Sequence, residues 1–237
     1  MPEKAQESEI KFNYTFTFLA GRIKEFDVRL KRDSMSIIRP NGEKAPEWAK
    51  LKEFKCPHCP LDENQIEYCP LALNLIDILD EFSEDISYEL VDIKVETANR
   101  TYQKNTSLQT GVSSLLGILM VTSGCPIIGR LKPMLYFHLP FATLEETQVR
   151  AFSIYLLAQY LKSKRGDEPD WDLKNLARIY EDIGILNHNV SKKIVHLANK
   201  DASINSLVVL NNFADYVMMT LSDKTIDELE ECLKEFF

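Results

Sequence analysis

The sequence predicts an α+β fold, and three features of the chain carry that prediction. Strictly alternating apolar residues near the N-terminus are typical of strands with one buried face, and apolar residues three and four apart in the second half are typical of amphipathic helices. A stretch rich in cysteine and proline lies between them. We therefore expect an N-terminal antiparallel hairpin or small sheet with a cysteine-rich metal-binding loop, followed by a mostly helical C-terminal half.

The strands are predicted from residue alternation and turn chemistry. Apolar side chains alternate with polar ones over residues 10–18, and again over 26–30 after a turn at Ala20-Gly21. These two runs predict an antiparallel hairpin. Residues 35–38 are a candidate third strand, and residues 88–102 are the candidate for the strand that completes the sheet.

The helices are predicted from capping signals and apolar stripes. Pro70 suits the first position of a helix whose stripe is Ala72, Leu75, Ile76, Leu79 and Phe82. Residues 111–122 are nearly all apolar and predict a buried helix. Thr143 and Glu146 have the spacing of a capping box for a helix through Tyr160. Further helices are expected over residues 172–182, 191–199, 202–221 and 225–236.

Length and composition favour one domain over residues 1–237. The chain has 237 residues and is 45% apolar, which is enough for a sizeable core. The alternative is a subdivision within the polar stretch 162–169, giving an α+β metal-binding part over residues 10–161 and a helical part over residues 170–237.

Charge and hydropathy exclude several classes of partner. The net charge is −8, the sequence pI is about 5.2, and the cations are scattered, so we expect no nucleic-acid partner and no anionic membrane surface. The longest apolar run, residues 115–121, is too short to span a membrane. Because the cysteine count is odd and two cysteines have metal-ligand spacing, we expect a soluble protein of a reducing compartment, the cytoplasm.

Four of the five cysteines directly precede a proline: Cys56, Cys59, Cys69 and Cys125. Proline fixes the backbone after each sulfur and removes an N–H group, which suits a loop that directs sulfur toward a common centre. Cys56 and Cys59 have C-x2-C spacing, nine residues precede Cys69, and 55 more precede Cys125. The pattern predicts one four-cysteine metal site with structural zinc as the cofactor. A 4Fe-4S cluster is the alternative, since it uses the same ligands. Buried free cysteines are a third interpretation.

Two histidines could modify this prediction. His58 lies between the first two ligands and could replace one cysteine, giving a site of three cysteines and one histidine. His138 has apolar neighbours, so we expect a buried, neutral core histidine, with a metal ligand or catalytic base as the alternative. Cys232 lacks a following proline, and packing is its expected role.

No catalytic motif is found in the sequence. It lacks a glycine-rich phosphate loop, H-E-x-x-H, G-x-S-x-G and a dinucleotide fingerprint. Glu146 and Arg150 are expected to form an ion pair on one helix face. An enzyme would instead need a polar pocket that combines His138 and Arg150 with Tyr155 and Gln159.

We therefore expect a metal-binding protein that acts as a binding or regulatory module with a structural four-cysteine zinc site and an unidentified protein or small-molecule partner. An iron–sulfur protein with a redox or regulatory role, or a metal-dependent enzyme, is the alternative. Whether the chain is an enzyme is left open by the sequence.

Several elements together resemble an uncharacterised bacterial family, a domain of unknown function. They are the order of the four Cys-Pro units, the Ser123-Gly124-Cys125-Pro126 element, the His138-Leu139-Pro140-Phe141 segment and the helix with Arg150, Tyr155 and Gln159. The resemblance covers nearly the whole chain. It implies a bacterial, cytoplasmic, single-domain protein and brings no activity, substrate or catalytic residue.

Overall fold

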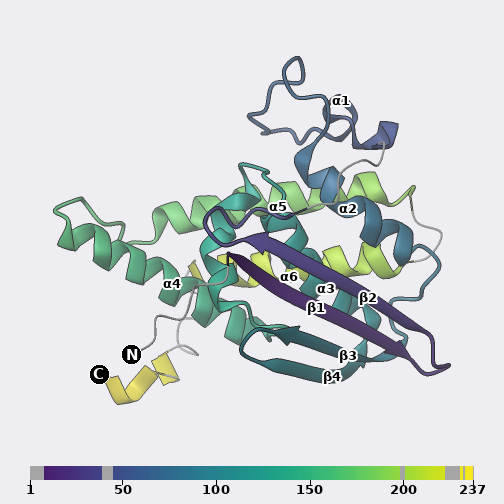
Figure 1. Cartoon of the computed structure of the whole chain (residues 1–237). Helices are drawn as coiled ribbons and strands as arrows, with labels where there is room; N and C mark the ends of the chain where they lie inside the picture. Colours follow the sequence, from purple (N-terminus) through teal and green to yellow (C-terminus); the bar gives the residue numbers. More distant parts are fainter. Residues whose placement is uncertain (1–7, 39–44, 198–200, 222–229, 232, 237) are drawn as a thin grey trace.

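The chain folds into an N-terminal four-stranded antiparallel sheet followed by a helical half (Figure 1). The structure, a computed structural model, describes residues 8–38, 45–197, 201–221, 230–231 and 233–236. The strands are β1 (Glu9–Phe18), β2 (Ile23–Lys31), β3 (Leu90–Thr97) and β4 (Thr101–Ser107), in the order β2-β1-β3-β4. The helices are η1 (Glu47–Ala49), α1 (Leu51–Phe54), α2 (Pro70–Glu81), α3 (Leu108–Val121), η2 (Ile128–Phe137), α4 (Leu144–Lys164), α5 (Lys174–Ile194), α6 (Ala202–Leu221) and η3 (Lys234–Phe236). The predicted α+β class is confirmed.

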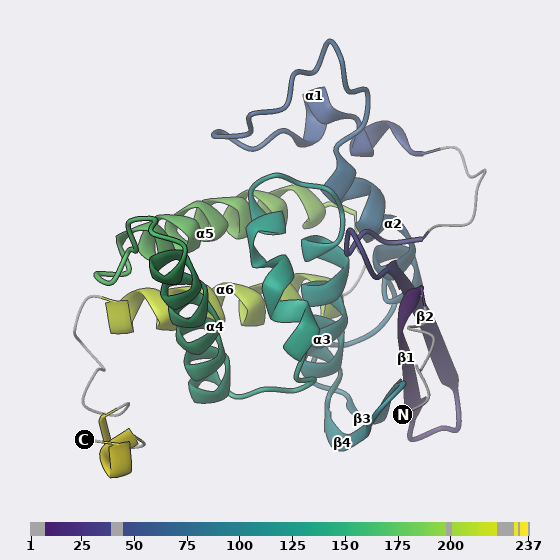
Figure 2. The same cartoon turned by 60° about the vertical axis from the view of Figure 1, so that its left-hand side comes forward.

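One face of the sheet packs on helices and the other faces solvent. Every second residue of β1 is buried, from Phe12 to Phe18, and β3 continues the same face with Ile93. The ring of Phe16 meets that of Phe82, just after α2, at a centroid distance of 5.1 Å. Figure 2 shows the helices gathered on this one side of the strands. The alternation in the sequence therefore records a sheet with one buried face.

Helix α3 lies between the sheet and α6, which explains why almost all of its residues are apolar. On the sheet side, Gly111 lets the helix backbone approach the side chains of Ile93 and Phe16. On the opposite side, Gly117 faces Leu210 of α6, 3.8 Å from an ideal Cβ position. A helix covered on both sides needs no polar face.

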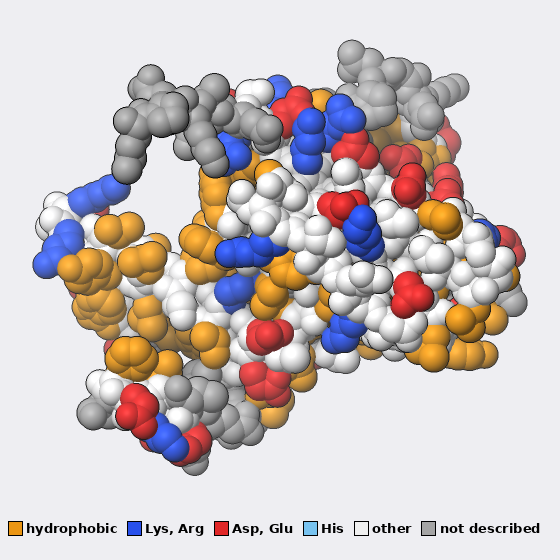
Figure 3. Space-filling model, turned by 60° about the horizontal axis from the view of Figure 1, so that its bottom comes forward, with side chains coloured by type: hydrophobic (Ala, Val, Ile, Leu, Met, Phe, Trp, Pro, Cys, Tyr) orange, Lys and Arg blue, Asp and Glu red, His pale blue; other side chains and the backbone are white. Residues whose placement is uncertain are grey.

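Helices α5 and α6 pack together behind α3, and α4 extends away from the body (Figure 1). The far part of α4 exposes Leu157, Tyr160 and Leu161, and Figure 3 shows the hydrophobic side chains that gather there. Among the described residues no helix has the length and apolar character needed to cross a membrane.

Two strand predictions are corrected by the structure. The N-terminal hairpin forms as expected, with Gly21 at a positive φ of 79° in its turn. Residues 35–38 make only an isolated bridge between Ile37 and Leu30, because Met35 has a left-handed backbone, φ 53°, that interrupts extension. Residues 88–102 are not one strand: the Thr97 hydroxyl accepts the Arg100 N–H in a turn that separates β3 from β4.

The helix predicted over residues 202–221 is confirmed as α6, with the same bounds. The prediction of two separate helices in the region of α5 is wrong. The helix expected over residues 172–182 runs on without a break to Ile194, because Ile183, Leu186 and Val190 extend its buried stripe. Of the second helix, expected over residues 191–199, only the first four residues belong to α5, and its last two lie outside the described residues. The helix η2 was not predicted from the sequence, since it contains Pro133. Part of the helix expected over residues 225–236 lies outside the described residues.

Candidate functional site

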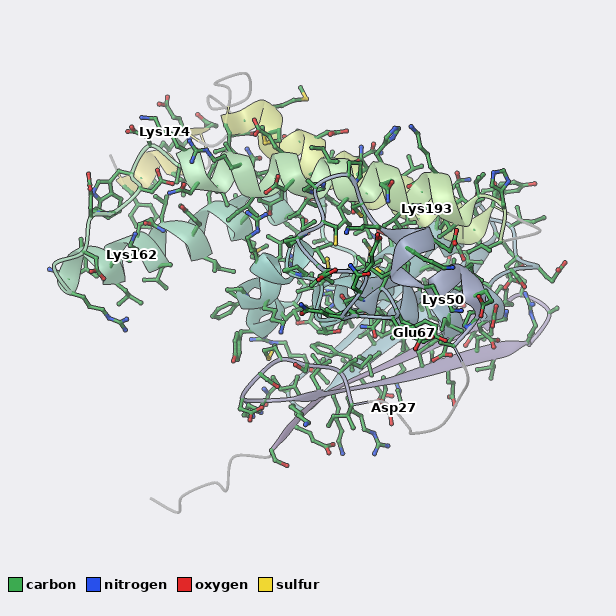
Figure 4. All side chains as sticks on the ribbon, turned by 90° about the horizontal axis from the view of Figure 1, so that it is seen from above. Asp27, Lys50, Glu67, Lys162, Lys174 and Lys193 are labelled. Atoms are coloured by element: carbon green, nitrogen blue, oxygen red, sulfur yellow. The ribbon has the colours of Figure 1, made fainter. Side chains whose placement is uncertain are left out.

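The first three cysteines belong to a loop, residues 45–69, that is closed at its base by backbone hydrogen bonds. The N–H of Cys69 donates to the Ala49 carbonyl at 2.8 Å, and the N–H of Leu51 donates to the Glu67 carbonyl at 2.8 Å. Lys193 of α5 donates to the carbonyl oxygen of Glu53 in this loop. Figure 4 labels Lys193 on α5 and Lys50 and Glu67 in the loop segment. The loop is therefore fixed both to itself and to a helix far away in sequence.

Three separate segments bring the four cysteines into one neighbourhood. Cys56 and Cys59 form a turn in which the Cys59 N–H donates to the Cys56 carbonyl at 3.1 Å. Cys69 occupies the position directly before α2, as Pro70 predicted, and Cys125 follows α3. An ideal Cβ on Gly124 would lie 3.8 Å from the Cβ of Pro70, so the chain beside Cys125 passes close to the chain beside Cys69.

Hydrogen-bond donors are directed at three of the sulfurs. The backbone N–H groups of Leu71 and Ala72 donate to Cys69. Those of Ile127 and Ile128 donate to Cys125. The side chain of Asn189, on α5, donates to the sulfur of Cys56 at 3.3 Å. Such donors are typical around metal-bound thiolates, because they disperse the negative charge on sulfur.

Burial raises the pKa of three of these thiols, those of Cys56, Cys69 and Cys125, and so keeps them protonated in the absence of a metal. It raises the pKa of Cys56 to about 12, and the neighbouring Cys69, Cys125 and Cys59 contribute further to that rise. Burial likewise raises the pKa of Cys69 and of Cys125. All four sulfur groups are thus within electrostatic reach of one another. A cation in their midst would reverse the effect by stabilising the thiolates.

The metal site itself remains a prediction. Within the described ranges, no group of three or more His, Cys, Asp or Glu side chains is placed to hold a metal ion. The backbone gathers the predicted ligands, while the side chains are not arranged around a common centre. The fifth cysteine, Cys232, lies outside the described residues.

His58 lies between Cys56 and Cys59 in the sequence, and one of its ring nitrogens has no hydrogen-bond partner among the described residues. Its Nε2 lies 3.0 Å from the carbonyl oxygen of Asp182, which can only accept, so Nε2 carries the proton. Nδ1 then presents a lone pair, and it is buried without a hydrogen-bond partner among the described residues. Asp182 also pairs with Arg130, whose charge lowers the pKa of Cys125 against the larger effect of burial. The alternative of three cysteines and one histidine therefore stays open.

His138 directly follows the last residue of η2 and contacts β1 of the sheet. Its Nε2 is 2.9 Å from the Tyr14 hydroxyl, which is also 2.9 Å from the Ser114 hydroxyl. The ring of Phe12 meets the imidazole edge-on at 5.3 Å. Burial, helped by the charge of Arg150, lowers the pKa of His138 to about 3. The lowered pKa agrees with the expected neutral histidine, although His138 is half-buried and not enclosed in the core, and its partner Tyr14 was not foreseen.

The predicted ion pair between Glu146 and Arg150 is wrong. Glu146 completes the expected capping box instead, accepting the Thr143 N–H at 2.8 Å. Arg150 turns inward, where its Nε and Nη1 atoms are buried without hydrogen-bond partners in the described part of the chain. Burial lowers the pKa of Arg150, although an arginine stays charged.

Tyr155 and Gln159 do not join His138 in a pocket. Tyr155 donates to the Asp170 carboxylate at 2.8 Å, and Gln159 accepts the Asp170 N–H at 2.9 Å. These two residues hold the loop after α4. Arg150 instead lines a cavity together with Ser113 of α3 and Asn187 of α5. Sequence reasoning missed these two residues, because no local spacing connects α3, α4 and α5.

Comparison with known families matches residues 12–234 to a domain of unknown function, DUF6901. The chain belongs to the DUF6901 family. No curated protein and no solved structure matches the chain. The family match confirms the resemblance to an uncharacterised family over nearly the whole chain, and DUF6901 assigns no activity to any residue.

Proposed function

We propose that this DUF6901 chain is a binding module whose loop 45–69 is held to the helices by a structural zinc ion. The ligands would be Cys56, Cys59, Cys69 and Cys125. The observation that carries the proposal is that three of these sulfurs already receive N–H donors of the kind that surround metal thiolates, from the helix α2, from the loop after α3 and from α5. Zinc binding would require the four cysteine side chains to turn their sulfurs toward a common ion.

Zinc suits this site because it needs only four tetrahedral ligands at about 2.3 Å and undergoes no redox chemistry. A four-thiolate ion has no open position for substrate or water, so the metal is structural and the binding surface lies elsewhere. Since the buried thiols are protonated beforehand, zinc binding would release protons. His58 would remain outside the shell, with its Nδ1 as the replacement ligand if one cysteine does not bind.

The test is the metal content and the stability of variants. We expect one zinc per chain and proton release on zinc addition to metal-free protein in weak buffer. Cys59→Ser should lower the melting temperature and remove the effect of chelator, because the binding energy of a structural ion is largely folding energy. The matched control is Cys232→Ser, which lacks the Cys-Pro context and should keep both the zinc content and the destabilising effect of chelator. If the Cys59 variant and chelated wild type melt like untreated protein, the zinc proposal is wrong.

An iron–sulfur cluster is the second candidate, because a cluster uses the same four cysteines and Cys-Pro also follows cluster ligands in ferredoxins. Purification without oxygen separates the two: brown protein that contains iron and sulfide identifies a cluster, and colourless protein with zinc identifies the structural ion. Cobalt substitution then distinguishes the ligand sets. The sulfur-to-cobalt charge-transfer band should keep its intensity in His58→Gln for a four-cysteine site, and the spectrum should change if His58 is a ligand.

A further inference from the structure

A cavity of about 160 Å³ lies between α3, η2, α4, α5 and α6. Most of its wall is apolar, including Leu131, Met134 and Leu135 of η2 and Val209, Leu210 and Phe213 of α6. Its volume is close to that of an engineered protein cavity of about 150 Å³ that binds benzene. The cavity therefore has room for one six-membered ring or a short branched chain.

Three polar side chains on this wall have atoms without hydrogen-bond partners among the described residues. They are Arg150 through Nε and Nη1, Ser113 through its hydroxyl and Asn187 through Oδ1. Ser113 and Asn187 are each only 2% exposed. Buried polar groups in folded proteins almost always have partners, and leaving them unpaired is unfavourable. Three such groups around one cavity point to a molecule that would supply the partners.

Arg150 sets the charge of that molecule. A guanidinium group binds a carboxylate through two parallel hydrogen bonds, which come from Nη2 together with either Nε or Nη1. Both Nε and Nη1 of Arg150 are without partners in the described chain, so either edge of the group is available. Glu146, one turn earlier on α4, is engaged in the capping box. The other titratable groups at the cavity, His138 and Tyr180, are neutral at physiological pH, since burial lowers the pKa of the first and raises that of the second. No described residue of the cavity wall carries a negative charge. Glu146, outside that wall, raises the pKa of Arg150 through its charge, but no ion pair joins the two side chains in the described part of the chain.

The geometry points to a binding site for a small organic acid, with its carboxylate on Arg150 and its apolar body against η2 and α6. A hydroxyl on that body would pair with Ser113 or Asn187, which lie on α3 and α5. The acid is limited to about the size of benzoate or isovalerate by the cavity volume. Acetate is too small to fill the apolar wall, and phosphate lacks an apolar body.

The site goes beyond the proposed zinc function, although the two share structural elements. Ile128 of η2 lines the cavity and donates its N–H to Cys125. On α5, Asn187 lines the cavity and Asn189 donates to Cys56. Binding experiments therefore use the protein as purified, with whatever metal it holds, and their readout does not depend on that metal.

The experiment is calorimetric titration of the full chain with benzoate, 4-hydroxybenzoate and isovalerate, with acetate, phosphate and toluene as comparisons. We expect the three organic acids to bind more tightly than the comparison compounds. Arg150→Met should weaken benzoate binding on the order of 10- to 100-fold, as expected for loss of hydrogen bonds to a charged group. Arg150→Lys keeps the charge without the paired geometry and should give an intermediate loss.

The matched control is Arg165→Met, the same substitution at an exposed position beyond the end of α4. It should leave benzoate binding unchanged. Circular dichroism and melting of the two methionine variants establish that both fold. The proposal is overturned if none of the organic acids binds, if Arg150→Met binds benzoate like wild type, or if toluene or phosphate binds as tightly as benzoate.

Discussion

Replacing Gly111 by alanine should destabilise the fold, because α3 touches the sheet at this position. An ideal Cβ on Gly111 would lie 2.1 Å from Cδ1 of Ile93 and 2.8 Å from Cε1 of Phe16, and both of these neighbours are fully buried. Carbon atoms pack best at about 3.5–4.0 Å, so Ile93 would have to move by more than about 1 Å in a filled core.

The magnitude follows from two opposing contributions. Overpacking of a core by an extra carbon typically costs about 1–3 kcal/mol. The higher helix propensity of alanine returns about 1 kcal/mol. Because the overlap with Ile93 is severe, we expect a net loss of about 1–2 kcal/mol in the free energy of unfolding. For a chain of this size that corresponds to a melting temperature lower by roughly 2–8 °C.

The assay is urea unfolding of Gly111→Ala and of a matched control, Gly184→Ala. Gly184 lies inside α5 with no atom within 4 Å of its ideal Cβ. The control should therefore gain up to about 1 kcal/mol from propensity alone. The midpoint should fall for Gly111→Ala at an unchanged m value. A Gly111→Ala midpoint at or above that of wild type, with the control behaving as expected, would refute the close approach of α3 to the sheet.

Three further predictions concern polar groups of the core. Burial lowers the pKa of His138 to about 3 in the folded chain, below its ordinary value of about 6.5. Between these two pH values the imidazole is therefore protonated in the unfolded chain and neutral in the folded chain. The free energy of unfolding should therefore fall by about 1.4 kcal/mol per pH unit below pH 6.5, and His138→Gln should flatten this slope in urea titrations. Tyr14→Phe removes the hydroxyl that the side chains of Ser114 and His138 share as a hydrogen-bond partner. The free energy of unfolding should fall by about 1–3 kcal/mol, and a urea midpoint equal to that of wild type would contradict this prediction. Asp85, 2% exposed, pairs with the nearly buried Lys24 at 2.7 Å and with Arg22 at 2.6 Å. Asp85→Asn should therefore cost about 3–5 kcal/mol, and a loss below about 1 kcal/mol in urea unfolding would contradict a buried ion pair.

Local sequence determined much of the secondary structure and the chemistry of the predicted site. The alternation over residues 10–18 gave β1 with its buried face, and Thr143 and Glu146 gave the start of α4 through a capping box. The position of Cys69 directly before α2 also followed from the sequence, because Pro70 favours the first helical turn. Each of these features depends on residues that are close together in the sequence, so each can be predicted from the sequence alone.

Only the tertiary structure decided where the polar side chains point and which distant residues meet. A spacing of four residues allowed Arg150 to pair with Glu146 on the helix surface, but packing of α4 against the body turned Arg150 inward. Asn189 reaches Cys56 across 133 positions of sequence, which no local pattern could indicate. The cavity likewise exists because five helices meet without filling the space between them. Such features arise from the fit of whole elements, since burial and contact between distant segments are set by how the elements pack and not by neighbours along the chain.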